Sequence, residues 1–417
     1  MNNMNENIIL DYENICPHND FCGGCIYQEK TYKEQLDIKE IMVKELLENK
    51  DIKYDKVEPI EPSPHIYKYR NKMEYTFGDL SKDGELTLGM HKKGNFMSII
   101  TVDKCQLVPP EFNQILRATL DFAIEKDYTK YHKKSHKGLL RNLIVRKGFR
   151  TNELLVNIVT ASDCSPFSLP NINESNKNRY IFDETEFVQT IMNLKFQDSN
   201  VKVVGVLRTI NDNLADKVTC EELKVLHGRD YYNEKILDLN FKVSAFSFFQ
   251  TNIEAIENLY YTALSLPKDF GNKTVYDLFC GTGTISQELA LKAKEVYGIE
   301  IIGEAVESAI ENAKLNNLTN CHFIEGDVFK VLRDNTFNKP DMIVVDPPRM
   351  GIEPKALDEI IEFGVNEIVY VSCNPKTLVE NLYYLQFHGY NVKYVKPFDN
   401  FPNTKHVECV VLMSKNK

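Results

Sequence analysis

The pattern of hydrophobic and polar residues changes at about residue 272. Beyond this point, short apolar runs typical of buried strands alternate with longer runs of helical periodicity, as at residues 274–279 and 285–293. This alternation predicts an α/β domain with a doubly wound, Rossmann-like sheet. The final apolar runs, 392–397 and 407–413, leave no room for a crossover helix, so we expect them to be antiparallel.

Before residue 272 the pattern is mostly that of antiparallel strands. Residues 67–101 alternate between apolar and polar positions and are interrupted by turn residues, which predicts a β-meander. Further strands are predicted at residues 154–159, 190–196 and 203–210. A helical pattern at residues 31–49 comes before all of these strands.

Length and charge limit the possible functions. The 417 residues are 43% hydrophobic and 26% charged, enough for two or three domains with ordinary cores. We expect a small N-terminal module at residues 1–64, a mostly antiparallel β central domain at 65–245 and the α/β domain at 246–417. The net charge of −10 excludes a protein that coats nucleic acid or membrane through its overall charge.

The sequence also indicates a cellular compartment. It contains no apolar run of about 18 residues and no basic start followed by an apolar segment, so we expect neither a membrane span nor a secretory signal. We therefore expect a cytoplasmic protein, whose ten cysteines stay reduced. Such cysteines are better explained as metal ligands, catalytic groups and core residues than as disulfides.

One segment of this acidic chain is strongly basic. Residues 129–150 contain eight lysines or arginines and no acidic residue. With Tyr131 and Phe149 among the cations, this segment could follow an RNA backbone and stack bases, and we expect Arg141 and Arg146 to contact phosphates. The central domain at 65–245 is therefore the expected RNA-binding domain, and the alternative for this segment is a solvated loop.

A glycine-containing turn predicts a nucleoside site in the α/β domain. The run D-L-F-C-G-T-G-T-I-S at 277–286 leaves a strand, turns on glycines and enters a helix, which lets a ligand approach the backbone. Ser286 stands where a dinucleotide fingerprint requires glycine. Glu300 ends the next strand, where it can accept hydrogen bonds from ribose hydroxyls, and Asp327 follows the third strand, within reach of an adenine edge. These acids suit S-adenosylmethionine; another Rossmann ligand or plain turn glycines are the alternatives.

The fourth strand ends in the sequence D-P-P-R at 346–349. Related D-P-P turns that hold an exocyclic amine for methylation continue with an aromatic residue, whereas this turn continues with Arg349. Amine methylation is therefore less favoured. The simpler alternative for Asp346 is a surface carboxylate on a rigid turn.

A cysteine and a glutamate complete the candidate chemistry. Cys373, in V-S-C-N-P, lies at the end of the fifth strand, and the helix expected from Pro375 would lower its thiol pKa through the helix dipole. Glu408 begins the final strand. A thiolate that adds to carbon 6 of uracil makes carbon 5 nucleophilic toward a methyl sulfonium, and a base must then remove the hydrogen on carbon 5. Taken alone, Cys373 would be a core residue and Glu408 a surface charge.

Together these motifs resemble the RNA (uracil-5-)-methyltransferase family, which includes bacterial ribosomal RNA and transfer RNA 5-methyluridine enzymes. The resemblance rests on F-F-Q-T-N, D-L-F-C-G-T-G, D-P-P-R, S-C-N-P and H-V-E in that order. It implies Cys373 as nucleophile and Glu408 as the proton-abstracting base. It also implies an S-adenosylmethionine site lined by Gln250, Phe279, Thr284, Glu300, Asp327 and Asp346. Many members begin with an additional RNA-binding β-barrel, which we expect this chain to lack.

Four cysteines suggest a metal site. Cys16, Cys22 and Cys25 form C-x5-C-x2-C, and Cys105 lies 80 positions after the third. Zinc sites usually pair two close C-x2-C knuckles, whereas three close thiolates and a distant fourth recur in iron–sulfur proteins. The family resemblance also implies a four-iron four-sulfur cluster, as in its ribosomal RNA branch. Zinc and metal-free thiols remain alternatives.

These observations predict a cytoplasmic, monomeric RNA (uracil-5-)-methyltransferase of class EC 2.1.1.-. The target carbons are hidden by stacking in a duplex, so a single-stranded or flipped uridine is expected. The first candidate substrate is 23S ribosomal RNA, and the second is uridine in the T-loop of transfer RNA. An amine methyltransferase that uses the D-P-P turn and a non-catalytic iron–sulfur RNA-binding protein are the competing interpretations.

Overall fold

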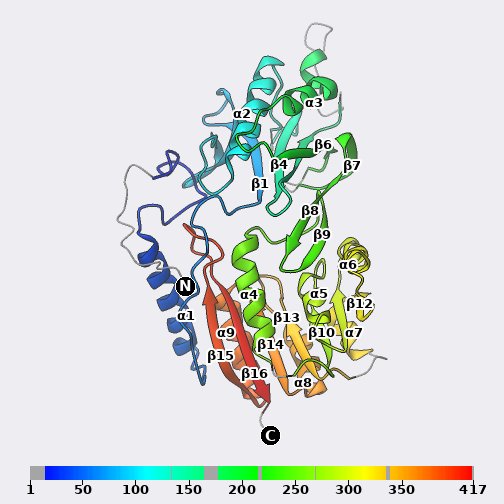
Figure 1. Cartoon of the computed structure of the whole chain (residues 1–417). Helices are drawn as coiled ribbons and strands as arrows, with labels where there is room; N and C mark the ends of the chain where they lie inside the picture. The colour runs from blue at the N-terminus through cyan, green and yellow to red at the C-terminus, as the bar shows by residue number, and fades with distance from the viewer. Residues whose placement is uncertain are drawn as a thin grey trace. The chain divides into compact units, whose positions relative to one another are not determined.

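The computed structural model describes residues 15–132, 134–163, 177–214, 218–267, 269–334 and 339–415. The chain forms two compact units (Figure 1). Unit 1 comprises Met1–Glu29, Tyr67–Glu234 and Val243–Ala245, and unit 2 comprises Lys30–Ile66, Lys235–Lys242 and Phe246–Lys417. Residues 1–64 are therefore divided between the two units. The domain boundaries expected at residues 64 and 245 stay a prediction.

Unit 1 is built on a seven-stranded sheet in the order β3-β2-β1-β4-β5-β6-β7. Only β5 and β6 pair in parallel, so the predicted mostly antiparallel character is confirmed. Helices α2 and α3 pack on the sheet through a shared core that includes Phe112, Leu116 and Phe187. The elements are β1 (Lys72–Asp79), β2 (Leu86–Lys92), β3 (Asn95–Thr101), α2 (Pro110–Glu125), β4 (Leu140–Gly148), β5 (Glu153–Thr160), η3 (Lys177–Tyr180), α3 (Glu184–Met192), β6 (Lys202–Ile210) and β7 (Glu222–Gly228).

The strand predicted at residues 190–196 is wrong, because residues 190–192 are the last turn of helix α3 and residues 193–196 form no strand. Asp183 caps the helix by accepting a hydrogen bond from the amide of Glu186. Phe187 and Ile191 lie one turn apart and are both fully buried. The cap and the spacing of these two residues outweigh the β-branched side chains that suggested a strand.

Strand β4 contains much of the basic segment, and its arginines are buried. Arg141 and Arg146 are 6% and 2% exposed. Arg141 donates through Nη1 to the carbonyl oxygens of Asn211 and Asn213, at 2.8 and 2.9 Å. The expectation that these two arginines contact RNA phosphates is therefore wrong, because both faces of this strand are covered. Of the eight cations, Lys133 lies outside the described residues.

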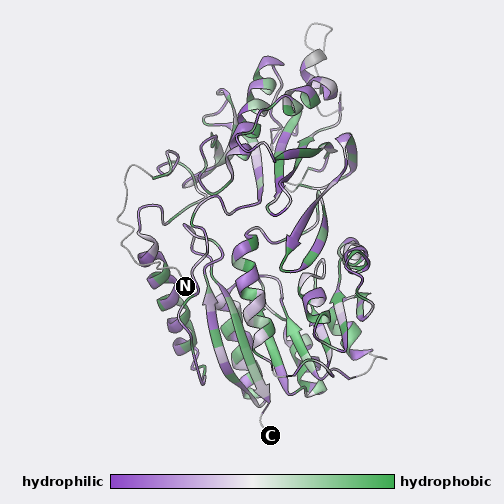
Figure 2. Ribbon diagram, viewed as in Figure 1, coloured by the Kyte–Doolittle hydropathy of each residue, from purple (hydrophilic) through white to green (hydrophobic). Residues whose placement is uncertain are grey.

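Unit 2 contains the predicted Rossmann-like sheet, in the order β12-β11-β10-β13-β14-β16-β15. The first five strands are parallel, and β16 runs antiparallel to both β14 and β15, as expected. The strands are β10 (Thr274–Leu278), β11 (Glu295–Glu300), β12 (Cys321–Glu325), β13 (Met342–Val345), β14 (Glu367–Ser372), β15 (Tyr390–Phe398) and β16 (Glu408–Lys415). Hydrophobic residues gather along the central strands (Figure 2).

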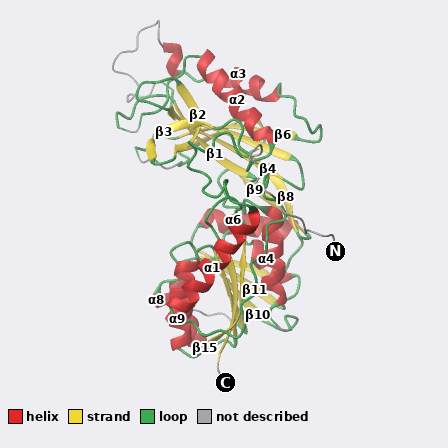
Figure 3. Ribbon diagram, turned by 90° about the vertical axis from the view of Figure 1, so that its left-hand side faces the viewer, coloured by secondary structure: helices red, strands yellow, loops and turns green. Residues whose placement is uncertain are grey.

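Helices cover both faces of this sheet (Figure 3). One face packs against α1, α7, α8 and α9 in a single apolar core. The helices are α1 (Tyr32–Asn49), α4 (Ile253–Ser265), α5 (Thr284–Ala290), α6 (Gly303–Leu315), α7 (Val328–Arg333), α8 (Pro354–Phe363) and α9 (Pro375–Phe387). A two-stranded ribbon, β8 (Tyr231–Ile236) and β9 (Leu239–Ser244), precedes α4.

The segment after α1 follows the outer strand of the sheet. Tyr54, Val57 and Glu61 form parallel bridges to β15. The amides of Asp55 and Glu58 donate to the carbonyl oxygens of Val392 and Val395, at 3.0 and 2.9 Å. This pairing covers an edge strand that would otherwise expose its backbone hydrogen-bonding groups.

Candidate active site

The glycine turn lies between strand β10 and helix α5. Phe279, Gly281 and Gly283 all have positive φ angles, of 65°, 54° and 75°. A Cβ atom on Gly283 would lie 2.6 Å from the ring of Phe323, so only glycine fits there. The turn brings the backbone next to Glu300, because the amide of Gly281 donates to Glu300 Oε2 at 3.0 Å.

The two predicted nucleoside-binding acids are held by backbone amides. Glu300 Oε1 accepts a second hydrogen bond, from the amide of Ile302 at 3.0 Å. Asp327 caps α7 by accepting from the amide of Lys330 at 3.1 Å. Both carboxylates are partly exposed at the carboxyl ends of neighbouring parallel strands. This is the edge at which open α/β sheets bind their ligands.

Two residues that the sequence analysis missed support the turn. Asp277 is fully buried and accepts a hydrogen bond from Ser286 Oγ at 2.5 Å, and burial raises its pKa to about 7. Tyr260, on α4, is hydrogen-bonded to Thr284 Oγ1 at 2.9 Å and to Gln250. Asp277 begins the glycine motif and could have been found there, whereas no motif marks Tyr260.

The register of the last strands brings Cys373 and Glu408 together. Cys373 directly follows β14, and Glu408 is the first residue of β16. Because the two strands are antiparallel, the end of one meets the start of the other, and Ser372 pairs with Cys409. Asp346, directly after β13, lies at the same edge.

Burial governs the electrostatics of this group. Burial raises the pKa of Glu408 to about 7, and the Arg349 guanidinium opposes that shift. Burial, together with the carboxyl groups of Glu408 and Asp346, raises the pKa of the Cys373 thiol to about 12. The expected lowering by the dipole of α9 is therefore wrong, because desolvation and two neighbouring carboxyl groups outweigh it.

Arg349 links the D-P-P turn to the other catalytic candidates. Its Nη2 lies 2.9 Å from His406 Nδ1, two residues before Glu408. Its carbonyl oxygen accepts hydrogen bonds from Asn374 Nδ2 at 2.9 Å and from Thr377 Oγ1 at 3.3 Å, at the start of α9. The guanidinium favours the anionic forms of both Cys373 and Glu408.

The four cysteines of the predicted metal site line one cavity of about 40 Å³ in unit 1. The loop that carries Cys22 is joined to β2 through the amide of Gly23, which donates to the carbonyl oxygen of His91 at 3.1 Å. Burial raises the pKa of Cys25 to about 12 and that of Cys105 to about 11. Across the described ranges, no group of three or more histidine, cysteine, aspartate or glutamate side chains is arranged to hold a metal ion.

The sheet order, the glycine turn and the acids at the strand ends define unit 2 as a Rossmann-like methyltransferase domain that uses S-adenosylmethionine. A model of the tRNA (uracil-5-)-methyltransferase family matches residues 179–416. The chain belongs to this family, and the protein is an RNA methyltransferase.

Similar proteins agree with this assignment. An uncharacterized RNA methyltransferase of Clostridium tetani is 47% identical, over 97% of this chain and 85% of the relative. Another uncharacterized RNA methyltransferase, from Caldanaerobacter subterraneus, is 46% identical over 98% of this chain and 86% of the relative. The crystal structure of the Pyrococcus abyssi tRNA (uracil-54, C5)-methyltransferase with S-adenosyl-L-homocysteine has a TM-score of 0.72 and 26% identity, covering 94% of this chain and 86% of that one.

Among the helices that the structure describes, none is both long enough and apolar enough to cross a membrane.

Proposed function

We propose that this enzyme methylates carbon 5 of a uridine in structured RNA, with Cys373 as the nucleophile and Glu408 as the base. The observation that carries the proposal is the pairing of Ser372 with Cys409, which sets the two side chains at adjoining strand ends. An amine methyltransferase would need neither residue. A binding protein without catalysis would have no use for a buried carboxyl group beside a thiol.

The proposed reaction balances with these two residues. The Cys373 thiol first loses its proton to solvent, a step that the Arg349 guanidinium favours. The thiolate then forms a bond to carbon 6, and the electrons of the carbon 5–carbon 6 double bond move to the uracil carbonyl system. When bound, S-adenosylmethionine supplies an electrophilic methyl group, which carbon 5 attacks. Glu408 then takes the hydrogen from carbon 5 as a proton, the double bond re-forms and the thiolate leaves. A carboxyl pKa of about 7 suits a base that works near neutrality.

The methyl donor is proposed to bind along the strand ends of unit 2. Glu300 would accept hydrogen bonds from the ribose hydroxyls, since each carboxylate oxygen can accept more than the one amide it already receives. Asp327 would face the adenine edge. The remaining proposed contacts are Gln250, Phe279, Thr284 and Asp346. Tyr260 is hydrogen-bonded to both Gln250 and Thr284 and so connects these two residues.

The RNA substrate is proposed to be 23S ribosomal RNA, because the cysteine pattern resembles that of the ribosomal RNA branch. A transfer RNA T-loop uridine is the second candidate, favoured by the similarity to the Pyrococcus abyssi enzyme. Mapping of 5-methyluridine in ribosomal and transfer RNA from a strain without this gene distinguishes the two. Loss from one RNA class identifies the substrate.

The four cysteines are proposed to bind a four-iron four-sulfur cluster. Cys16, Cys22, Cys25 and Cys105 line a common cavity, and thiolates are the ligands that iron–sulfur clusters use. The rest of the lining combines apolar side chains, such as Met73 and Leu107, with polar ones, such as His18 and Gln28. No step of the uridine reaction requires electron transfer, so the proposed role of the cluster is structural.

Trapping with 5-fluorouridine RNA tests the catalytic assignment. Fluorine cannot leave carbon 5 as a proton does, so the wild-type enzyme should stay covalently attached after methyl transfer. Cys373→Ala should form no attached complex, whereas the matched control Cys409→Ala, at a fully buried cysteine, should still do so. Glu408→Gln should accumulate a methylated adduct on ordinary RNA. Formation of 5-methyluridine by Cys373→Ala would refute the mechanism.

A further inference from the structure

The connection between β15 and β16, residues 399–407, is packed inside unit 2. Asp399, Asn400 and Asn403 are only 1%, 2% and 1% exposed. Asn403 has a φ of 66°, in the left-handed region that residues other than glycine seldom adopt. A polar loop in such a conformation needs hydrogen-bonding partners. These come mainly from α1, which lies far away in the sequence.

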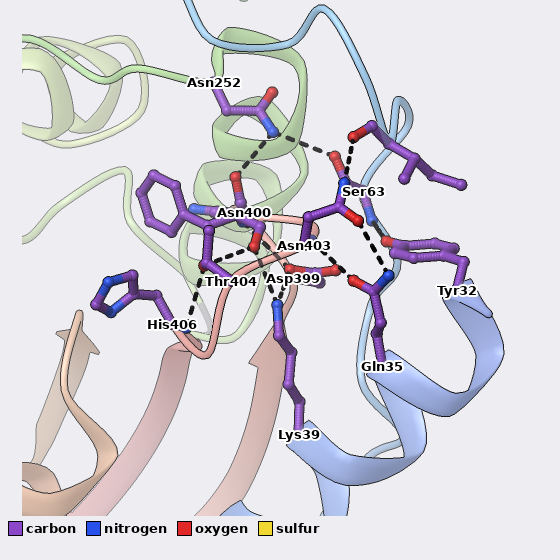
Figure 4. A network of polar contacts seen from close by, with 12 residues as sticks. Tyr32, Gln35, Lys39, Ser63, Asn252, Asp399, Asn400, Asn403, Thr404 and His406 are labelled. Carbon is purple, nitrogen blue, oxygen red and sulfur yellow. Dashed lines mark hydrogen bonds and ion pairs between the residues drawn. The ribbon is translucent and has the colours of Figure 1, made fainter. Parts of the chain in front are cut away.

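Helix α1 contacts the connection through the side chains of Tyr32, Gln35 and Lys39, of which Tyr32 is hydrogen-bonded to Asp399 (Figure 4). Lys39 Nζ lies 2.5 Å from Asp399 Oδ1 and donates to the carbonyl oxygen of Phe401 at 3.1 Å. The side chains of this ion pair are 1% and 0% exposed. Gln35 bonds Asn403 in both directions: its Nε2 donates to Asn403 Oδ1 at 3.2 Å, and its Oε1 accepts from the Asn403 amide at 2.8 Å.

Further hydrogen bonds extend from the ion pair toward Glu408. Asn252, the N-cap of α4, donates to the carbonyl oxygen of Asn400 at 2.9 Å. Thr404 Oγ1 donates to the carbonyl oxygen of Phe401 at 2.8 Å and accepts from the amide of His406 at 3.3 Å. The connection is therefore fixed at its start, in its middle and near its end.

We propose that the Lys39–Asp399 ion pair is a positioning device for Glu408, a role that rests on the proposed function. Asp399 directly follows Phe398, which is the cross-strand partner of Glu408. Anchoring Asp399 to α1 therefore fixes the turn that delivers the base to Cys373. A buried ion pair is a poor source of stability, because desolvation offsets most of the attraction, but it can specify one arrangement of a loop.

The test compares variants of the pair in the full-length enzyme. Lys39→Met leaves the buried Asp399 carboxylate without its cation, whereas the double variant Lys39→Met/Asp399→Asn removes both charges of the pair and keeps an oxygen for the amide of Phe401. Lys39→Arg restores a cation. The control is Lys44→Met on the same helix, which removes a partly exposed pair with Glu40. Circular dichroism and thermal melting identify the folded variants.

Three measurements separate positioning from general damage. We expect the folded double variant to lose about 10- to 100-fold in kcat on ordinary RNA, the effect of a small misplacement of a catalytic group. Its KM for S-adenosylmethionine and its rate of trapping by 5-fluorouridine RNA should stay within about threefold of wild type, and a methylated adduct should accumulate on ordinary RNA. Lys39→Arg should recover part of kcat, and Lys44→Met should match wild type.

Two results would overturn the positioning role of the ion pair and leave the proposed function intact. The first is full turnover by the folded double variant, and the second is an equal loss of trapping and turnover in that variant. If Lys39→Met does not fold, the double variant and Lys39→Arg still decide between these outcomes. A wild-type enzyme that 5-fluorouridine RNA does not trap would instead refute the proposed function, and the positioning role with it.

Discussion

Glu408 is expected to set the pH dependence of the reaction. Burial raises its pKa to about 7, and the group must be deprotonated to accept the hydrogen of carbon 5. The single-turnover rate of 5-methyluridine formation should therefore fall more steeply with decreasing pH below about 7, where Glu408 becomes protonated, than above it, where only the Cys373 thiol still has to lose a proton. Rates measured from about pH 5.5 to 8.5 check this. A rate that does not change across this range would assign the proton to another base.

Removal of the Arg349 guanidinium should shift the dependence of the reaction rate on pH. This guanidinium favours the anionic forms of Glu408 and Cys373, so Arg349→Ala should move the inflection to higher pH. Because Arg349 is exposed, the loss of rate at neutral pH should be modest, about three- to tenfold, and smaller at high salt. Arg349→Lys should retain part of the effect, and Lys376→Ala, on the exposed face of α9, is the matched control. An unshifted inflection in Arg349→Ala would contradict this electrostatic role.

Single residues differ in how well the sequence predicts them. Cys373, Glu408 and Glu300 could be singled out because each stands at a recognisable strand end. Lys39 could not, because its partner lies 360 positions away and an isolated lysine in a helix is normally solvated. The high pKa of Cys373 was also missed, since it depends on carboxyl groups that only the fold brings near.

At the scale of secondary structure, β4 shows that a basic segment need not be a binding surface. Arg141 lies inside unit 1, where its guanidinium also stacks over the ring of Tyr131, 4.0 Å from the ring centre. Arg141→Glu should therefore lower the free energy of unfolding by about 3 kcal/mol or more, because it leaves a buried, unpaired carboxylate. Urea unfolding measures this.

The matched control for Arg141→Glu is Lys137→Glu, at an exposed position of the same segment. It should change stability by less than about 0.5 kcal/mol. If Arg141→Glu is as stable as this control and only RNA affinity falls, the arginine acts at the surface after all.

The periodic elements were predictable, and the exceptions have physical causes. Parallel strands of unit 2 are nearly continuous apolar runs, and the short spacing before β16 excluded a crossover helix. Helix α3 was not predicted because Thr190 and Ile191 are β-branched residues that favour strands, and because the cap that starts the helix lies before the predicted run, at Asp183. Alternation alone also could not show that both faces of β4 are buried.

At the scale of the whole molecule, the proposed cluster and the proposed methyl-donor site belong to different units. Cys22→Ser should therefore release iron and sulfide and destabilise unit 1, while affinity for S-adenosylmethionine changes less than about twofold. Iron and sulfide analysis, absorption near 400 nm and calorimetric titration of the methyl donor measure these effects. Cys220→Ser, at an exposed cysteine, is the control.

Anaerobically purified protein that contains stoichiometric zinc and no sulfide would contradict the iron–sulfur assignment. Protein that contains about four irons per chain would support it.

The ion pair between Lys39 and Asp399 also bears on how the chain folds during synthesis, because its partners are separated by 360 positions. The segment that contains α1 is made well before β15, which that segment covers. Helix α1, of 18 residues, should gain most of its stability from packing its buried face against the rest of unit 2, as helices in proteins usually do. Helix α1 can therefore dock only after β15 has been made, so the core that it shares with the sheet closes late in the folding of unit 2, and contacts between parts so far apart in the sequence form slowly.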